Sequence, residues 1–293
     1  MPDLFSIPIN ALLGQLLLGL INGSFYALLS LGLAVIFGLL NVINFLHGAQ
    51  YMMGAFVAWM LLEWLGLSYW WSLLLAPILV GLSGIIIERL FIRRLYHLDH
   101  LYGLLLTFGL TLIIEGVFRK FFGSAGIPYD SPIQGGVRTP YLYIPNYRVW
   151  VLVVSFVVCI GIWLLIEKTK LGAYLRAAIE KPDIVRSFGI NVPLMVTAIY
   201  GVGVALAAFA GVLAAPIYSV NPLMGSNLII ILFAVVVIGG MGSVKGAILA
   251  GFMLGIIEGL VKVVYPPLSD TVVFLIMIVV LVFKPAGLFG KAA

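Results

Sequence analysis

Long apolar segments separated by short polar gaps run through almost the whole chain. The apolar segments are 11–40, 48–65, 70–91, 101–119, 149–167, 193–215, 227–240, 246–264 and 270–284. A transmembrane helix needs about 20 mostly apolar residues to cross a hydrocarbon core about 30 Å thick, and most of these segments have that length. The pattern predicts an all-α, polytopic transmembrane helical bundle with about eight spans, built as a single membrane-spanning domain over residues 1–293.

Two segments depart from this simple pattern. Segment 11–40 is long and has an Asn-Gly pair inside it, so it can form one tilted helix or two short ones. Segment 227–240 is short and ends in two glycines, which favours a broken or re-entrant helix, because irregular backbone in a membrane is tolerated only where protein or a water-filled cavity covers it. Residues 1–10 carry Asp3 and no basic residue, so we expect an uncleaved first span rather than a signal peptide.

The composition excludes a soluble protein. Hydrophobic residues make up 63% of the chain and charged residues 9%, whereas soluble domains average about 45–50% and about 25%. The net charge of +5 does not indicate a nucleic-acid partner, because the basic residues lie in the short gaps between apolar segments. Their placement fits the excess of Lys and Arg in cytoplasmic loops of membrane proteins, so the expected surroundings are a lipid bilayer.

The basic gaps also predict the orientation. They contain Arg89, Arg93 and Arg94, then Lys168, Lys170, Arg176, Lys181 and Arg186, and finally Lys284 and Lys291. All fall on one side if segments 101–119 and 149–167 are single spans, and we assign that side to the cytoplasm. The loop at 121–147 is then extracytoplasmic. Five basic residues fall outside on this arrangement: Arg119, Lys120, Arg138, Arg148 and Lys262.

Small residues recur every four positions along three segments. They are Gly19, Gly23 and Ala27, then Ala207, Gly211 and Ala215, and finally Ala247, Gly251, Gly255 and Gly259. Faces of small residues let helix backbones approach closely in a membrane, where hydrophobicity does not drive helices together. We therefore expect Gly19, Gly23, Gly251, Gly255 and Gly259 to serve helix packing.

The polar stretch at 168–192 differs from every other gap. Leu171, Tyr174, Leu175, Ala178 and Ile179 recur at helical spacing. Pro182 should then end that helix, Asp183 can begin a second one and Gly189 can stop it. Two short amphipathic helices on the cytoplasmic side are predicted. They can be an interfacial connector whose Lys and Arg side chains extend to water, or a docking surface for a cytoplasmic protein.

Several polar residues lie inside apolar surroundings and are candidates for lining a translocation path. They are Asn22, Ser24, Asn41, Asn44, His47 and Gln50. The last four share one stripe if their region is helical. Polar groups within a membrane often mark pathways, and the alternative is that these side chains brace the bundle by hydrogen bonding between helices. Glu115 with Arg119, and Glu258 with Lys262, are four residues apart, and pairing within each helix would lower the cost of a charge in the membrane.

Residues for catalysis, metal binding or ATP binding do not stand out. Cys159 is the sole cysteine and lies in an apolar run, and the three histidines have no cluster of ligands around them. No nucleophile is paired with a base. The stretch from Gly239 to Gly246 contains Lys245 but lacks the spacing of the phosphate-binding loop of ATPases. We expect no cofactor bound by this chain.

Three motifs stand in order along nearly the whole chain, at 33–49, 171–191 and 239–247, and together they resemble those of the branched-chain amino acid ABC permeases of the LivH type. Leu33 to Ala49 reads LAVIFGLLNVINFLHGA and resembles their early signature. Leu171 to Asn191 reads LGAYLRAAIEKPDIVRSFGIN and resembles their ATPase-coupling loop. Gly239 to Ala247 reads GGMGSVKGA, is followed by a G-x-x-x-G-x-x-E pattern ending at Glu258, and resembles their late signature.

The resemblance implies a permease subunit of an ABC importer in a bacterial or archaeal cytoplasmic membrane. Its implied partners are a second, related permease, two cytoplasmic ATPases that use ATP and Mg, and an extracytoplasmic substrate-binding protein. Branched-chain or related amino acids are the implied substrates. The coupling residues that it implies are Leu171, Arg176, Ala177, Glu180, Lys181, Pro182, Arg186 and Gly189.

Three alternatives remain open at this point. Related permeases carry urea, short amides or aromatic compounds, and the binding protein decides much of that choice. A self-sufficient secondary carrier or channel would need ion-coupling carboxylates inside the spans, which are scarce here. An intramembrane enzyme would need a nucleophile–base pair or a metal cluster.

Overall fold

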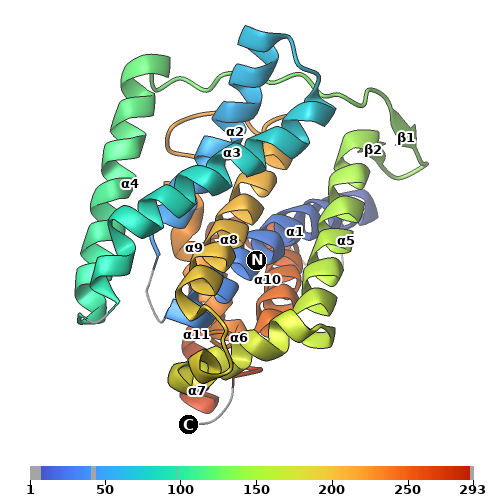
Figure 1. Ribbon diagram of the computed structural model, residues 1–293. Helices are drawn as coiled ribbons and strands as arrows, with labels where there is room; N and C mark the ends of the chain where they lie inside the picture. The colour runs from blue at the N-terminus through green and yellow to red at the C-terminus, as the bar shows by residue number, and fades with distance from the viewer. Residues whose placement is uncertain (1–7, 41–43, 97, 291–293) are drawn as a thin grey trace. The chain divides into compact units, whose positions relative to one another are not determined.

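The computed structural model describes residues 8–40, 44–96 and 98–290 and consists almost entirely of helices (Figure 1). The helices are α1 Ile9–Leu40, α2 Leu46–Leu65, α3 Tyr69–Leu90, η2 Ile92–Leu95, α4 His100–Phe122, α5 Asn146–Lys168, α6 Lys170–Glu180, α7 Pro182–Ser187, α8 Val192–Ala214, α9 Ser226–Gly239, α10 Val244–Val264, η3 Pro266–Leu268 and α11 Val272–Phe283. Strands β1 Gly136–Arg138 and β2 Tyr143–Pro145 pair antiparallel in a small hairpin. The all-α class is confirmed.

Six helices are long and apolar enough to cross a membrane in the described part of the chain. They lie at Ile9–Gly38, Tyr69–Leu95, His100–Phe122, Asn146–Lys168, Val192–Ala214 and Val244–Val264. Helix α2 has 20 residues, but His47, Gln50 and Glu63 lower its mean hydropathy below that of the six. Helices α9 and α11 are apolar and shorter. The chain is therefore a multi-pass membrane protein.

The structure decides both ambiguous segments. The first is one continuous helix of 32 residues. The segment expected to be broken is the 14-residue helix α9, whose length of about 21 Å at 1.5 Å per residue is less than a full span. It ends at Gly239, and the next residue, Gly240, has φ of 104°, a left-handed conformation that favours glycine.

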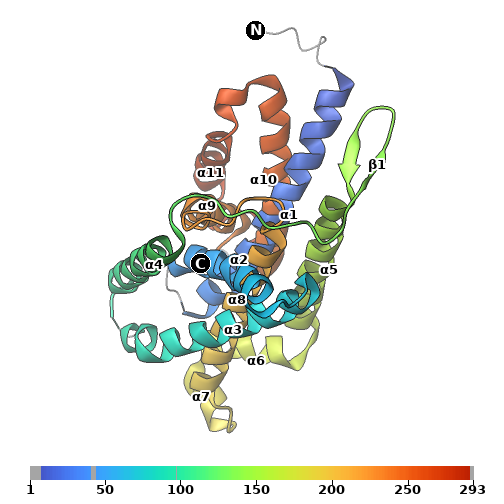
Figure 2. The same ribbon diagram turned by 90° about the horizontal axis from the view of Figure 1, so that it is seen from above.

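The chain divides into two compact units. Unit 1 comprises residues 1–31, 131–160 and 231–293, and unit 2 comprises residues 32–130 and 161–230. In unit 1, α1 and α10 run side by side (Figure 2). A Cβ on Gly255 would collide with the backbone of Gly23, and one on Gly251 would collide with that of Ala27. The faces of small residues on these two helices, which are far apart in sequence, thus bring the two backbones into direct contact.

The C-terminal end of the short helix α9 is capped by residues that follow α11. The amides of Leu288 and Phe289 donate to the carbonyls of Ile238 and Gly239, at 2.8 Å and 3.1 Å. These carbonyls belong to the last turn of a helix, where no partner exists within the helix itself. Segment 286–290 thereby satisfies the carboxyl end of α9.

In unit 2, α8 packs against both α2 and α3. Glycines again bring the helices close, because a Cβ on Gly54 would collide with the backbone of Ala208 and one on Gly211 with the carbonyl of Tyr51. One cluster of buried side chains comprises Ile36, Val80, Ile92, Tyr200, Val204 and Ala208. Helix α8 is consequently the centre of this unit.

Candidate functional site

The polar stretch between α5 and α8 forms two short helices, as the sequence predicts. Helix α6 ends at Glu180, and α7 begins with Pro182 in its first turn. Lys181 lies between them with φ of −144°, because the residue before a proline is driven away from helical geometry. Gly189, with φ of 78°, follows the second helix as the predicted stop. The side chains of Ile179, Glu180 and Pro182 lie outside the described part of the chain.

One face of this α6–α7 segment is anchored to the start of α8. Ala178 of α6 and Val185 of α7 are buried with Val192, the first residue of α8. Ile190, Met195 and Val196 pack against these three side chains. Since α7 and α8 share this apolar cluster, the segment and α8 are in direct mechanical contact.

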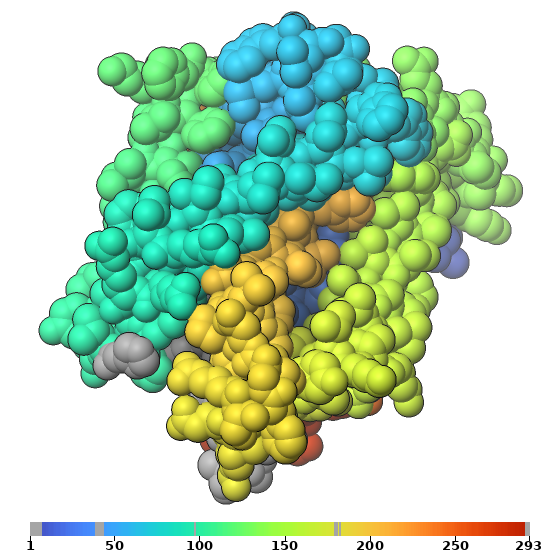
Figure 3. All heavy atoms as spheres, in the orientation of Figure 1, coloured from blue at the N-terminus to red at the C-terminus, as the bar shows by residue number. Residues whose placement is uncertain are grey.

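The other face of the α6–α7 segment is exposed. Its exposed apolar side chains are Leu171, Tyr174, Ile184 and Phe188. Phe188 is 79% exposed, and α7 with the turn after it, in yellow, lies at the lower edge of the space-filling view (Figure 3). Exposed apolar side chains of this kind are found where proteins contact other proteins or a membrane surface.

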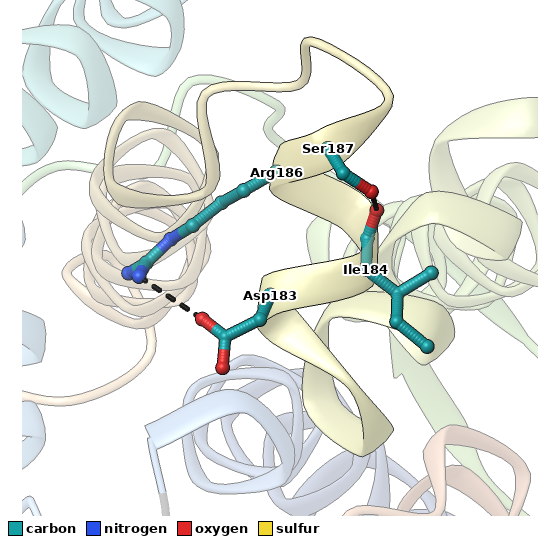
Figure 4. A network of polar contacts seen from close by, with 4 residues as sticks. All are labelled: Asp183, Ile184, Arg186 and Ser187. Carbon is teal, nitrogen blue, oxygen red and sulfur yellow. Dashed lines mark hydrogen bonds and ion pairs between the residues drawn. The ribbon is translucent and has the colours of Figure 1, made fainter.

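Basic residues are exposed on the same segment. Exposed residues of the predicted coupling set are Leu171, Arg176, Ala177, Lys181, Arg186 and Gly189. Arg186 Nη1 lies 3.4 Å from Asp183 Oδ1, and Ser187 Oγ donates to the Ile184 carbonyl at 2.7 Å (Figure 4). An ion pair this exposed contributes little stability, so the guanidinium is still available to a partner.

Arg176 has a structural contact in addition to its exposure. Its Nη1 donates to the Ile166 carbonyl at 3.0 Å, in the last turn of α5. A Cβ on Gly172 would collide with the same carbonyl. Arg176 therefore fastens α6 to the end of α5, a role that helical periodicity alone does not reveal.

Three of the polar path candidates gather where α2 begins. Asn44, His47 and Gln50 are all buried. Asn44 Nδ2 and Gln50 Nε2 both donate to the hydroxyl of Tyr200 on α8, at 3.2 Å and 3.3 Å. Among the described residues, Asn44 Oδ1 and Gln50 Oε1 have no hydrogen-bond partner. The site therefore holds two amide oxygens that can accept hydrogen bonds in a buried place, and sequence reasoning missed Tyr200 as their common partner.

The remaining path candidates are placed differently. Ser24 is buried, and its Oγ donates to the carbonyl of Ile21 in the same helix at 2.7 Å. Asn22 is half-buried on the same part of α1. Both belong to unit 1, whereas the three residues near α2 belong to unit 2. Asn41 lies outside the described residues.

A second buried polar cluster was not anticipated from the sequence. Glu88 is completely buried near the end of α3. Its Oε1 accepts from the hydroxyl of Tyr96 at 2.6 Å, and its Oε2 accepts from the hydroxyl of Thr197 at 2.8 Å. Burial, followed by the hydrogen bond to Glu88, raises the pKa of Tyr96 above its ordinary value of 10.0. The signal available in the sequence was an acidic residue at the end of an apolar segment.

The predicted pairing of carboxylates with bases four residues further on is wrong. Glu258 Oε2 accepts from the hydroxyl of Tyr26 at 2.8 Å, and Glu115 accepts from the hydroxyl of Ser226. The expected partners, Arg119 and Lys262, are exposed. Across the described ranges, Arg186–Asp183 is the one salt bridge. Hydroxyls on neighbouring helices reach the buried carboxylates, while the long basic side chains extend to water.

One further cavity in the described part of the chain is apolar. An apolar cavity of about 340 Å³ lies along α2 and α4, lined by Met60, Trp64, Val117, Phe118, Phe121 and Phe122. No side chain in that lining carries a charge. In residues 8–40, 44–96 and 98–290, no group of three His, Cys, Asp or Glu side chains could hold a metal ion.

Comparison with known proteins gives consistent matches along the chain. Residues 15–281 match the family model described as branched-chain amino acid transport system / permease component. The high-affinity branched-chain amino acid transport system permease protein BraD of Pseudomonas aeruginosa is 33% identical over 294 residues, covering 95% of this chain and 96% of that protein. LivH of Escherichia coli, which carries the same description, is 29% identical over the same shares.

An archaeal relative extends the similarity. The probable branched-chain amino acid transport permease protein LivH of Methanocaldococcus jannaschii is 28% identical, covering 92% of this chain and 90% of that protein. No solved structure gave a significant match. With nearly the whole helical bundle inside the matched range, the chain belongs to the family of permease components of branched-chain amino acid transport systems.

Proposed function

We propose that this chain is the membrane-spanning permease subunit of an ABC importer for branched-chain amino acids in a bacterial or archaeal cytoplasmic membrane. The observation that carries the proposal is the match of residues 15–281 to the permease family, together with relatives whose names specify branched-chain amino acid transport. The proposed partners are a second related permease, two cytoplasmic ATPases that use ATP and Mg, and an extracytoplasmic binding protein. The loop at 121–147 would face that binding protein.

The ATPase would dock on the α6–α7 segment at the cytoplasmic side. The exposed face combines apolar side chains, of which Phe188 is the most exposed, with the basic residues Lys181 and Arg186. Interfaces draw most of their binding energy from a few large apolar or arginine side chains surrounded by polar contacts. The buried contact of Val185 with Val192 supports transmission of ATPase closure into α8.

The solute path would use the buried amides near α2. The oxygens of Asn44 and Gln50 have no partner among the described residues and can accept hydrogen bonds from an ammonium group once the path opens. Asn22, Ser24, Asn41 and His47 complete the proposed set of path residues.

Uptake by reconstituted complexes tests this proposal. Proteoliposomes would contain the permease with its candidate partner permease and ATPases, the binding protein outside and ATP inside. We expect ATP-dependent uptake of labelled leucine, isoleucine and valine. Uptake of urea, short amides or aromatic compounds in their place would refute the assignment of branched-chain amino acids as the substrates. Ion-driven uptake without ATPases would indicate a secondary carrier.

Single substitutions test the docking surface in the same complexes. Removing a large side chain from the centre of an interface costs about 2 kcal/mol or more, so Phe188→Ser should weaken ATPase association at least about thirtyfold. Arg186→Ala should lower both ATPase stimulation and transport. Arg94→Ala, at an exposed position on η2 and outside the α6–α7 segment, is the matched control and should behave as the unmodified protein. Normal association and transport in both α7-region variants would rule out this docking surface.

A further inference from the structure

Glu88 joins three elements of unit 2 that are separate in sequence. It lies near the end of α3, Tyr96 follows η2, and Thr197 lies in the second turn of α8. The two carboxylate oxygens accept one hydroxyl each, from Tyr96 at 2.6 Å and Thr197 at 2.8 Å. Glu88 is completely buried and has no salt bridge within the described residues. These hydroxyls are therefore the hydrogen-bond donors that compensate its removal from water.

The same face of α8 continues to the buried amides. Thr197 and Tyr200 are three residues apart and therefore neighbours on one face of the helix. Tyr200 accepts hydrogen bonds from Asn44 and Gln50, and its ring packs in the cluster that Tyr96 adjoins. One face of α8 thus carries both polar clusters of this unit.

The opposite end of this line of contacts is the α6–α7 segment. Val192, at the first turn of α8, shares an apolar cluster with Ala178 and Val185. At 1.5 Å per residue, Thr197 lies about 8 Å and Tyr200 about 12 Å along the helix from Val192. A rigid helix of this length conveys a displacement at its start to the amides without any further moving part.

We propose that Glu88 is a positioning residue that holds α8 against α3 and the turn after η2. Held in this way, α8 transmits movement of the α6–α7 segment to the buried amides of Asn44 and Gln50. The proposal rests on the proposed function. Packing and interhelical hydrogen bonds are what hold helices together in a membrane. Without the bond to Glu88, α8 would keep its apolar contacts but lose the directional contact that fixes its start against α3.

The test is Thr197→Val, which removes the hydroxyl and keeps the shape of the side chain. Thr111→Val is the matched control, because Thr111 is a buried threonine whose hydroxyl donates within its own helix, to the Thr107 carbonyl at 2.8 Å. Both are compared in the reconstituted complex by the number of ATP molecules hydrolysed per leucine transported. This ratio reports coupling and does not change when a variant merely lowers the amount of folded complex.

We expect Thr197→Val to assemble with the ATPases and to raise that ratio by up to about tenfold, the factor that corresponds to losing one hydrogen bond. Thr197→Ser keeps the hydroxyl and should restore the original ratio, and Thr111→Val should leave it unchanged. If Thr197→Val fails to assemble, Tyr96→Phe removes the other donor to Glu88 and should raise the ratio in the same way.

Two results would overturn the inference. The first is an unchanged ratio in Thr197→Val, or in Tyr96→Phe if Thr197→Val does not assemble. The second is that neither variant assembles, which would mean that Glu88 serves only the assembly of the complex. Failure of the proposed function is distinguishable from both, because the unmodified complex would then show no ATP-driven leucine uptake.

Discussion

Replacing Gly255 by alanine should destabilise the protein, although alanine is the better helix former. A Cβ at this position would collide with the backbone of Gly23 on α1, and backbone cannot move aside by rotating a side chain. Overpacking a well-packed contact costs about 1–3 kcal/mol, and a collision with backbone belongs at the upper end. The helix propensity of alanine returns only about 1 kcal/mol. The net expectation is a loss of about 2 kcal/mol.

Gly116→Ala is the matched control for this prediction. Gly116 lies inside α4, and a Cβ there would have nothing within 4 Å. The same substitution should therefore raise stability by up to about 1 kcal/mol, giving a difference of about 3 kcal/mol between the two variants. Thermal unfolding in one detergent, followed by loss of helical circular dichroism, measures both. Equal melting temperatures for the two variants would show that α1 and α10 do not meet at Gly255.

Two further predictions concern buried carboxylates and their donors. Tyr26→Phe removes the hydroxyl that donates to Glu258 and should cost about 1.5–3 kcal/mol in the same melting assay; a change of less than about 0.5 kcal/mol would contradict the contact. The second prediction concerns Tyr96, whose pKa is raised by burial and by the hydrogen bond to Glu88. Its protonated hydroxyl therefore contributes fully to the stability of the folded protein below about pH 10, the ordinary pKa of tyrosine. This contribution is lost as the pH rises from there towards the higher pKa of the folded state. Between about pH 10 and 11 the unmodified protein should therefore lose about 1 kcal/mol more than Tyr96→Phe, and parallel pH profiles of the two would refute the shift.

Local sequence was enough to predict most of the helices. Apolar runs mark the spans directly because the membrane requires them, and the break between α6 and α7 follows from Pro182 alone. Even the short length of α9 was visible in its pattern. These features depend on neighbouring residues in the chain, which periodicity and turn chemistry describe.

Partners across the bundle could not be predicted in this way. The donor to Glu258 is Tyr26, which is 232 residues away in sequence, and Tyr200 is 156 residues from Asn44. A helical pattern shows that a residue faces protein but not which helix it faces. The nearest base in sequence therefore seemed the natural partner of Glu258, whereas a hydroxyl on α1 occupies that place.

The closure of α9 by segment 286–290 has a consequence for local unfolding. Helices α9 and α11, with 14 and 12 residues, are each too short to span a bilayer as a regular helix. Because the amides of Leu288 and Phe289 complete the last turn of α9, that turn cannot fray without releasing the segment that follows α11. Hydrogen exchange at these two amides should therefore follow the opening of α9, so that the two short helices form one cooperative unit of the membrane bundle.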